Sequence, residues 1–177
     1  SQTQTGTLSG DVVTFTSEPL QDGYYALGIV EQITLTPTST QSKTFGALDP
    51  TFNYSTSPSV SLSGVLTRTT GENVGTYSLS IGTISSTQYS ITLVDTDFEI
   101  TKATPVITIS NISKSYGDAN FTLTPTSTST TTFSFTSSDS LIASVSGATV
   151  TIKKPGTVSI TISQPESQNY KTGTKTI

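Results

Sequence analysis

Three closely spaced acidic residues are the strongest candidates in this chain for a metal-binding site. Asp95, Asp97 and Glu99 occupy alternate positions, and alternate residues of a strand point to the same face of its sheet. Ca²⁺ binds about six to eight oxygen ligands, often from carboxylates. The three residues are therefore a candidate calcium site. A solvated strand face is the competing interpretation, because one strand supplies only part of a calcium shell and no D-x-D-x-D-G loop is present.

Most catalytic chemistry is excluded by residue types that the chain lacks. There is no His and no Cys, which excludes Ser-His-Asp and Cys-His catalysis, His or Cys metal sites and disulfides. A pair of carboxylates could serve glycoside hydrolysis, but such a pair needs a cleft and a shifted pKa, and the sequence marks neither. We therefore expect a protein that is not an enzyme and whose only cofactor, if any, is calcium.

Four other positions could carry binding or modification. Tyr24 is out of phase with its neighbour in the alternating pattern, so it is the tyrosine best placed to stack on a sugar. Asp139-Ser140-Leu141 matches a short acid–hydroxyl–apolar signal for O-glycosylation, which would modify Ser140, although such triplets are common by chance. Lys43 and Lys114 suggest a Lys–Asn isopeptide cross-link. That bond needs a buried lysine, and the turn-like contexts of both predict exposure.

Hydroxyl side chains dominate the composition, with 38 Thr and 29 Ser among 177 residues. Leu, Ile, Val and Phe number 43, enough for a hydrophobic core. The net charge is −4, and the eight basic residues form no run. The sequence therefore lacks the cluster of Lys and Arg that is typical of a nucleic-acid-binding protein. No stretch reaches the roughly 18 apolar residues of a membrane span. We therefore expect neither nucleic-acid binding nor membrane insertion.

Alternating apolar and polar residues recur almost throughout the chain. Such alternation over short runs rich in β-branched and aromatic residues predicts strands that bury one face. The clearest runs are residues 75–81, 89–93, 149–152 and 158–162. Turn signals such as Asp22-Gly23 and Lys154-Pro155-Gly156 separate the runs. No window has helical spacing, so the sequence predicts an all-β protein built as a sandwich or barrel.

The chain also repeats itself, which predicts two related modules. Three landmarks recur in the same order: residues 42–46 at 113–117, residues 75–81 at 156–162, and Tyr89 at Tyr170. The predicted modules are residues 32–102 and 103–177, with Pro105 just after the joint. Residues 1–31 are either part of an upstream module or extra strands on the first, and both alternatives stay open. Because Ile177 ends inside an alternating run, we expect a segment of a longer protein.

Several motifs in a fixed order suggest a family. In the first module these are Lys43-Thr44-Phe45-Gly46, Asp49-Pro50 and residues 62–68, 71–77, 89–92 and 97–102. In this order they resemble the MBG-type repeat of large bacterial surface proteins. Residues 103–177 resemble a companion bacterial immunoglobulin-like repeat through residues 114–118, 137–139 and 142–147. The resemblance implies tandem immunoglobulin-like β-sandwich modules in secreted adhesins, and it implies no catalytic residues.

The leading functional hypothesis is a repeat segment of a secreted adhesin at the bacterial cell surface. It would act mainly as a spacer or stalk that supports adhesion in biofilms or gliding motility, with neighbouring repeats of the same chain as partners. One alternative is a module that binds carbohydrate or extracellular matrix through exposed aromatic residues and loop carboxylates. Another is a filament subunit, in which residues 1–31 add a strand to the sheet edge of a neighbouring molecule.

Overall fold

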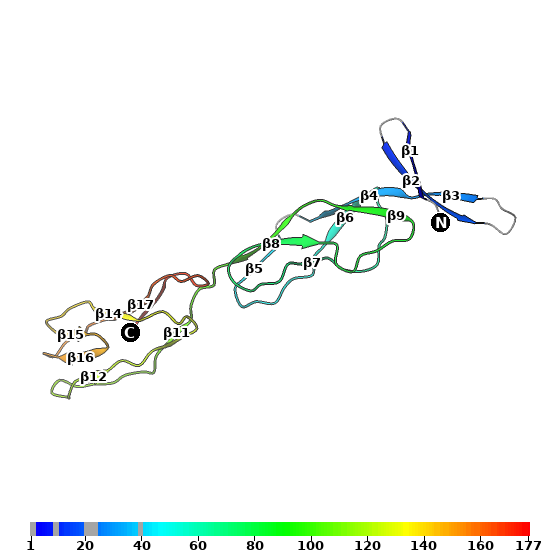
Figure 1. The fold of residues 1–177 in the computed structure, drawn as a ribbon. Helices are drawn as coiled ribbons and strands as arrows, with labels where there is room; N and C mark the ends of the chain where they lie inside the picture. Colours follow the sequence, from blue (N-terminus) through cyan, green and yellow to red (C-terminus); the bar gives the residue numbers. More distant parts are fainter. Residues whose placement is uncertain (1–2, 9–10, 20–24, 39–40) are drawn as a thin grey trace. The chain divides into compact units, whose positions relative to one another are not determined.

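The computed structural model of the chain describes residues 3–8, 11–19, 25–38 and 41–177 (Figure 1). All regular structure in these ranges is β-strand, and no helix occurs in them. The prediction of an all-β protein is confirmed. No helix long and apolar enough to cross a membrane occurs in the described part of the chain.

Two compact units make up the chain. Unit 1 comprises residues 1–42, 49–71 and 76–99, and unit 2 comprises residues 43–48, 72–75 and 100–177. Two loops that precede residue 100 in the sequence therefore belong to the second compact unit. At the start of unit 1, β1 (Thr3–Leu8), β2 (Asp11–Pro19) and β3 (Tyr25–Ile29) form an antiparallel sheet in chain order.

Two further sheets follow in the first part of the chain. In one, β4 (Glu31–Pro37) lies between β6 (Tyr54–Ser57), which is antiparallel to it, and β9 (Tyr89–Leu93), which is parallel to it. The other has the order β5 (Ser42–Thr44), β10 (Asp97–Thr101), β8 (Gly75–Ser80) and β7 (Thr67–Arg68). Their alternating inward residues form the core. Buried strand residues include Ile33, Leu35, Leu79, Phe98 and Ile100, and the connections add the buried Leu66 and Ile84.

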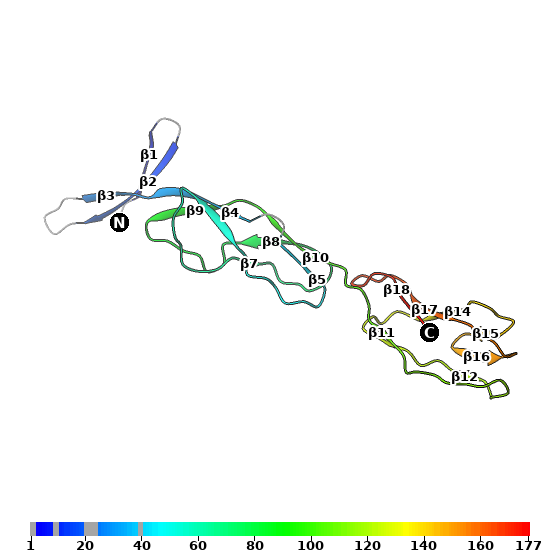
Figure 2. The ribbon, with the colours of Figure 1, turned by 180° about the vertical axis from the view of Figure 1, so that it is seen from behind.

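Three small sheets form unit 2, and Figure 2 shows β14, β17 and β18 side by side. Their strands are β11 (Ile107–Thr108) with β13 (Thr126–Ser127); β12 (Phe121–Thr122), β16 (Thr149–Ile152) and β15 (Ala143–Ser146); and β14 (Ser134–Ser137), β17 (Ile160–Gln164) and β18 (Gly173–Thr176). Leu123, Ala143, Val150 and Ile160 are the buried centre of one apolar cluster. Apolar alternation therefore produces a small core in this unit too.

The repeat in the sequence is also a repeat in the backbone pairing. The amide of Leu79 donates to Thr96 O at 3.1 Å, and 81 positions later the amide of Ile160 donates to Ile177 O at 2.9 Å. The parallel pairing of Glu31 with Tyr89 recurs as a parallel bridge between Ala103 and Tyr170. At these two places, equivalent residues of the repeat therefore have equivalent backbone partners.

Candidate functional site

A buried arginine organises the polar residues of unit 1. Arg68 makes a two-point contact with Asp49, from Nε to Oδ2 at 2.7 Å and from Nη2 to Oδ1 at 3.0 Å. Its Nη1 donates to the carbonyl of Gly71 at 2.5 Å, and the guanidinium lies over the rings of Tyr77 and Phe98 at 4.9 and 5.3 Å. The Arg68 side chain is only 6% exposed. Its hydrogen bonds therefore tie two loops to the core, and the guanidinium is not presented to a ligand.

The arginine contact was not predicted as a site, although its residues belong to the motifs that carry the resemblance. Asp49 and Arg68 are 19 positions apart, and no local spacing rule links residues at that distance. A cation and a carboxylate beside turn residues is a common surface pattern. The only available signal was the presence of both residues in one ordered set of motifs.

Lys43 lies inside unit 2, which contradicts the predicted exposure. Its side chain is 4% exposed, and its Nζ lies 2.5 Å from Glu72 Oε2. The reason is that Lys43 is on β5, whose alternation turns it inward, while Glu72 supplies the opposite charge that a buried ammonium needs. Lys114, its counterpart in the repeat, is exposed as predicted, with its Nζ 5.3 Å from the centre of the Phe121 ring.

A second group of contacts in unit 2 joins loops that are far apart in sequence. The side-chain amide of Asn169 donates to Asn73 Oδ1 at 2.9 Å, and Asn169 Oδ1 accepts from the amide of Val74 at 2.9 Å. Phe45 and Tyr170 pack edge to face, with ring centres 5.4 Å apart. We call residues Phe45, Asn73, Val74, Asn169 and Tyr170 the loop cluster. It connects two loops of the first repeat copy with one loop of the second.

The linker at residues 101–103 is bonded on both sides within the same unit. Thr101 O accepts from the amide of Phe45 at 2.8 Å, and the amide of Ala103 donates to Asn169 O at 3.0 Å. Between them, Lys102 Nζ donates to Ser167 O at 2.8 Å and pairs with Glu166. Residues 101–103 are therefore held by one loop of the first repeat copy and one loop of the second.

The structure does not bring the three predicted calcium ligands together as a metal site. Asp95 lies in the exposed connection before β10, while Asp97 and Glu99 are exposed on β10. Phe98 and Ile100 alternate with them and are fully buried. In the described ranges, no group of three acidic side chains could hold a metal ion. Calcium binding by these three residues therefore stays a prediction.

Of the predicted sugar-binding and glycosylation sites, the structure describes only the second. Tyr24 lies outside the described residues. Ser140 lies exposed in a turn between β14 and β15. The Asp139 carboxylate accepts from the amide of Leu141 at 2.8 Å, and its carbonyl accepts from the amide of Ala143 at 3.1 Å. Asp139 therefore shapes the turn, and glycosylation of the exposed hydroxyl stays a prediction.

Comparison with known families identifies the first repeat copy. Residues 33–99 match the MBG domain of the YGX type. The matched range begins within β4 and ends within β10, and it contains the Arg68–Asp49 contact. The match confirms the MBG part of the sequence resemblance. No curated protein and no solved structure matches the chain.

Proposed function

We propose that the chain is a non-enzymatic spacer segment of a secreted adhesin at the bacterial cell surface. Its two repeat copies, residues 32–102 and 103–177, would be tandem immunoglobulin-like β-sandwich modules. The MBG domain at residues 33–99 supports this proposal, because it is a repeat domain typical of surface proteins. The dense Thr and Ser content fits a surface that is hydrated and carries little charge.

The observation that carries the proposal is how the linker is bonded. A spacer transmits tension along its chain, and a free linker would be its most extensible point. Here residues 101–103 are hydrogen-bonded to loops from both repeat copies. The loop cluster adds two amide hydrogen bonds and one ring contact. In repeat proteins, such contacts between neighbours supply part of the stability of each copy.

A force experiment tests this mechanical role. With the chain tethered at both ends, Asn169→Ala removes both side-chain hydrogen bonds of the loop cluster, and we expect unit 2 to unfold at lower force. Two hydrogen bonds correspond to about 1–3 kcal/mol. Asn120→Ala is the matched control, since Asn120 is exposed and no side-chain contact is described for it. Equal unfolding forces for the two variants would contradict a mechanical role for these contacts.

A binding experiment separates the spacer from a carbohydrate-binding module. The chain is applied to a broad glycan array, once with calcium and once with EDTA, and its mass in solution is measured by sedimentation. We expect a monomer that binds no glycan in either buffer. Saturable binding to one glycan class would overturn the spacer proposal and assign recognition to this segment.

A further inference from the structure

The opening and closing strands of the first repeat copy lie side by side and run in the same direction. β4 pairs in parallel with β9 over five residues, from Glu31 opposite Tyr89 to Leu35 opposite Leu93. The amide of Val94 extends this ladder by donating to Leu35 O at 2.8 Å. The strand with which this copy begins is therefore bonded to a strand near its end.

The parallel arrangement continues where both segments change sheet. β5 follows β4 in the chain, β10 follows β9, and β5 and β10 are neighbours in the four-stranded sheet. The amide of Glu99 donates to Gln41 O at 3.2 Å, and the amide of Phe45 donates to Thr101 O at 2.8 Å. Because the bonded partners advance together along both strands, β5 and β10 are parallel. We call β4, β5, β9 and β10 the terminal strands.

This arrangement fixes how tension along the chain loads the hydrogen bonds. Tension pulls β4 from its amino end, at Glu31, and pulls the closing strands from their carboxyl end, at Thr101. In parallel strands these two points lie at opposite ends of the pair, so the strands are pulled to slide past one another. The evenly spaced hydrogen bonds of a parallel ladder then resist together. Two strands pulled apart from the same end would instead lose one bond at a time.

The β9 residues that bond to β4 follow from the register. Leu35 O accepts from the amide of Val94, and the bonds between two parallel strands recur at every second residue. Ser90 and Thr92 therefore direct their amides and carbonyls to β4, while their side chains are exposed. In the described sheet β9 is an edge strand with β4 as its neighbour. Sliding of β9 is therefore opposed by this one ladder and by side-chain packing.

The inward side chains of the ladder add that packing. Leu35 is fully buried and forms an apolar cluster with Leu66 and Ile84. Ile91 and Leu93 of β9 pack against the same cluster. Sliding of β9 would pull these two side chains out of their places and expose apolar surface to water, which costs free energy. Burial on one side also strengthens the backbone hydrogen bonds, since the local dielectric constant is low.

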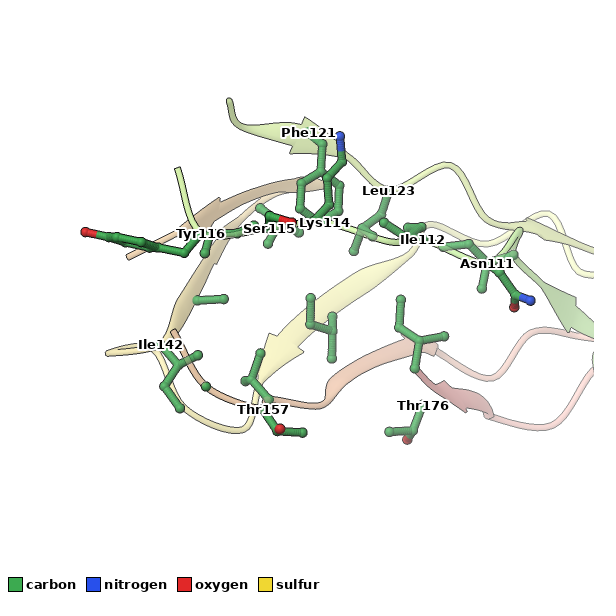
Figure 3. A pocket seen from close by; sticks show the side chains of 18 of the residues that line it. Asn111, Ile112, Lys114, Ser115, Tyr116, Phe121, Leu123, Ile142, Thr157 and Thr176 are labelled. Atoms are coloured by element: carbon green, nitrogen blue, oxygen red, sulfur yellow. The ribbon is translucent and has the colours of Figure 1, made fainter. Parts of the chain in front are cut away.

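In the second repeat copy, the equivalent pairing begins with the parallel bridge between Ala103 and Tyr170. β18 follows, and its Thr176 lines a groove of about 900 Å³ together with Ile112 (Figure 3). In the first copy, all four terminal strands are described, and each pairs with another of the four. The first copy is therefore the one in which the structure shows the complete parallel pairing.

We propose that the terminal strands of the first repeat copy form a mechanical clamp, which keeps this MBG domain folded under tension along the chain. The clamp resists sliding of its strands strongly and peeling weakly, so its strength depends on the direction of pull. The proposal rests on the proposed spacer function, to which it adds the strands that resist the tension.

Pulling the full chain in two directions tests the clamp. The chain contains no Cys, so pairs of introduced cysteines define where force is applied. Glu31→Cys with Thr104→Cys pulls the terminal strands to slide, whereas Glu31→Cys with Gln88→Cys peels β4 and β9 from the same end; all three positions are exposed. We expect the first copy to unfold at a force at least about twofold higher when sliding, because five residue pairs resist together. Equal melting temperatures of the two double variants would show that direction, and not stability, sets the force.

Two proline variants, made in the Glu31→Cys and Thr104→Cys chain, locate the resistance within the sheet. Thr92→Pro removes an amide that bonds β9 to β4. Ser55→Pro is the matched control, because it removes an amide that bonds β6 to β4 from the opposite edge. Each change deletes one ladder hydrogen bond at an exposed position of an edge strand. We expect similar losses in melting temperature, with the sliding force falling at least about twice as much for Thr92→Pro.

Equal unfolding forces in the two pulling directions would overturn the clamp, and this comparison remains available if a proline variant does not fold. An equal fall of the sliding force in the two folded proline variants would also overturn it. Either result would leave the spacer function standing, since glycan binding and the contacts of Asn169 test that function separately. Saturable glycan binding together with a direction-dependent force would overturn the spacer function and keep the clamp.

Discussion

Replacing Phe98 by Ala is expected to destabilise the first repeat copy more than any other single truncation of its core. Phe98 is 0% exposed and is the central inward residue of β10, between β5 and β8. Its ring contacts Phe52 edge to face and lies under the Arg68 guanidinium. The substitution removes the ring from both contacts and leaves a cavity at the centre of the sheet.

The size of the effect follows from burial and from these two contacts. A fully buried Phe replaced by Ala costs about 3–5 kcal/mol, including the cavity. Within that total, the edge-to-face ring pair contributes about 0.5–1.5 kcal/mol, and the cation over the ring contributes about 0.5–2 kcal/mol. Domains are stable by about 5–15 kcal/mol, so a large share of the stability of this small module is lost.

Urea unfolding followed by hydrogen exchange measures this loss separately in each unit. At about 2 kcal/mol per molar urea, the transition of unit 1 should move down by roughly 2 M. Phe135→Ala is the matched control, because Phe135 packs on the core of unit 2 and should shift only the transition of that unit. A loss below about 1 kcal/mol for Phe98→Ala would contradict its central place in the core.

Three further perturbations follow from the contacts of each unit. Arg68→Lys keeps the charge but loses the two-point contact with Asp49, so the free energy of unfolding should fall by about 1.5–3 kcal/mol; an unchanged urea midpoint would refute this. Gly64→Ala should destabilise more than Gly117→Ala, as thermal melts will show. Their φ angles are +106° and +100°, but a Cβ at Gly64 would lie 2.5 Å from Thr83 O, whereas nothing lies within 4 Å at Gly117. Equal losses would mean that backbone conformation alone sets the cost. The melting temperature should be the same in calcium and in EDTA, and a higher value in calcium would restore the three carboxylates as a metal site.

Much of the local structure could be predicted because it depends on short-range patterns. The alternation at Phe98 and Ile100 indicates a strand with one buried face, and β10 has that pattern of burial. The repeat offsets of 71 and 81 positions lead to equivalent backbone pairings at Leu79 and Ile160. These features require only that residues two positions apart share a face and that similar sequences form similar local structure.

Burial of individual charges could not be predicted in the same way. Lys43 and Lys114 occupy equivalent places in the repeat, yet Lys43 is buried with Glu72 and Lys114 is exposed over Phe121. The turn-like sequence around each lysine is similar, so local pattern treats them alike. The difference lies in residues distant in sequence, because β10 pairs with β5 beside Lys43 and Glu72 supplies the opposite charge there.

By itself, the sequence determined the fold class, the repeat and the absence of His and Cys chemistry, because composition and period two are properties of the chain alone. Only the tertiary structure decided which charges are paired and which earlier loops join residues 100–177 in unit 2. Those outcomes depend on residues tens of positions apart meeting in space, as Asn73 and Asn169 do. Such meetings are set by the path of the whole backbone, which no short window of sequence specifies.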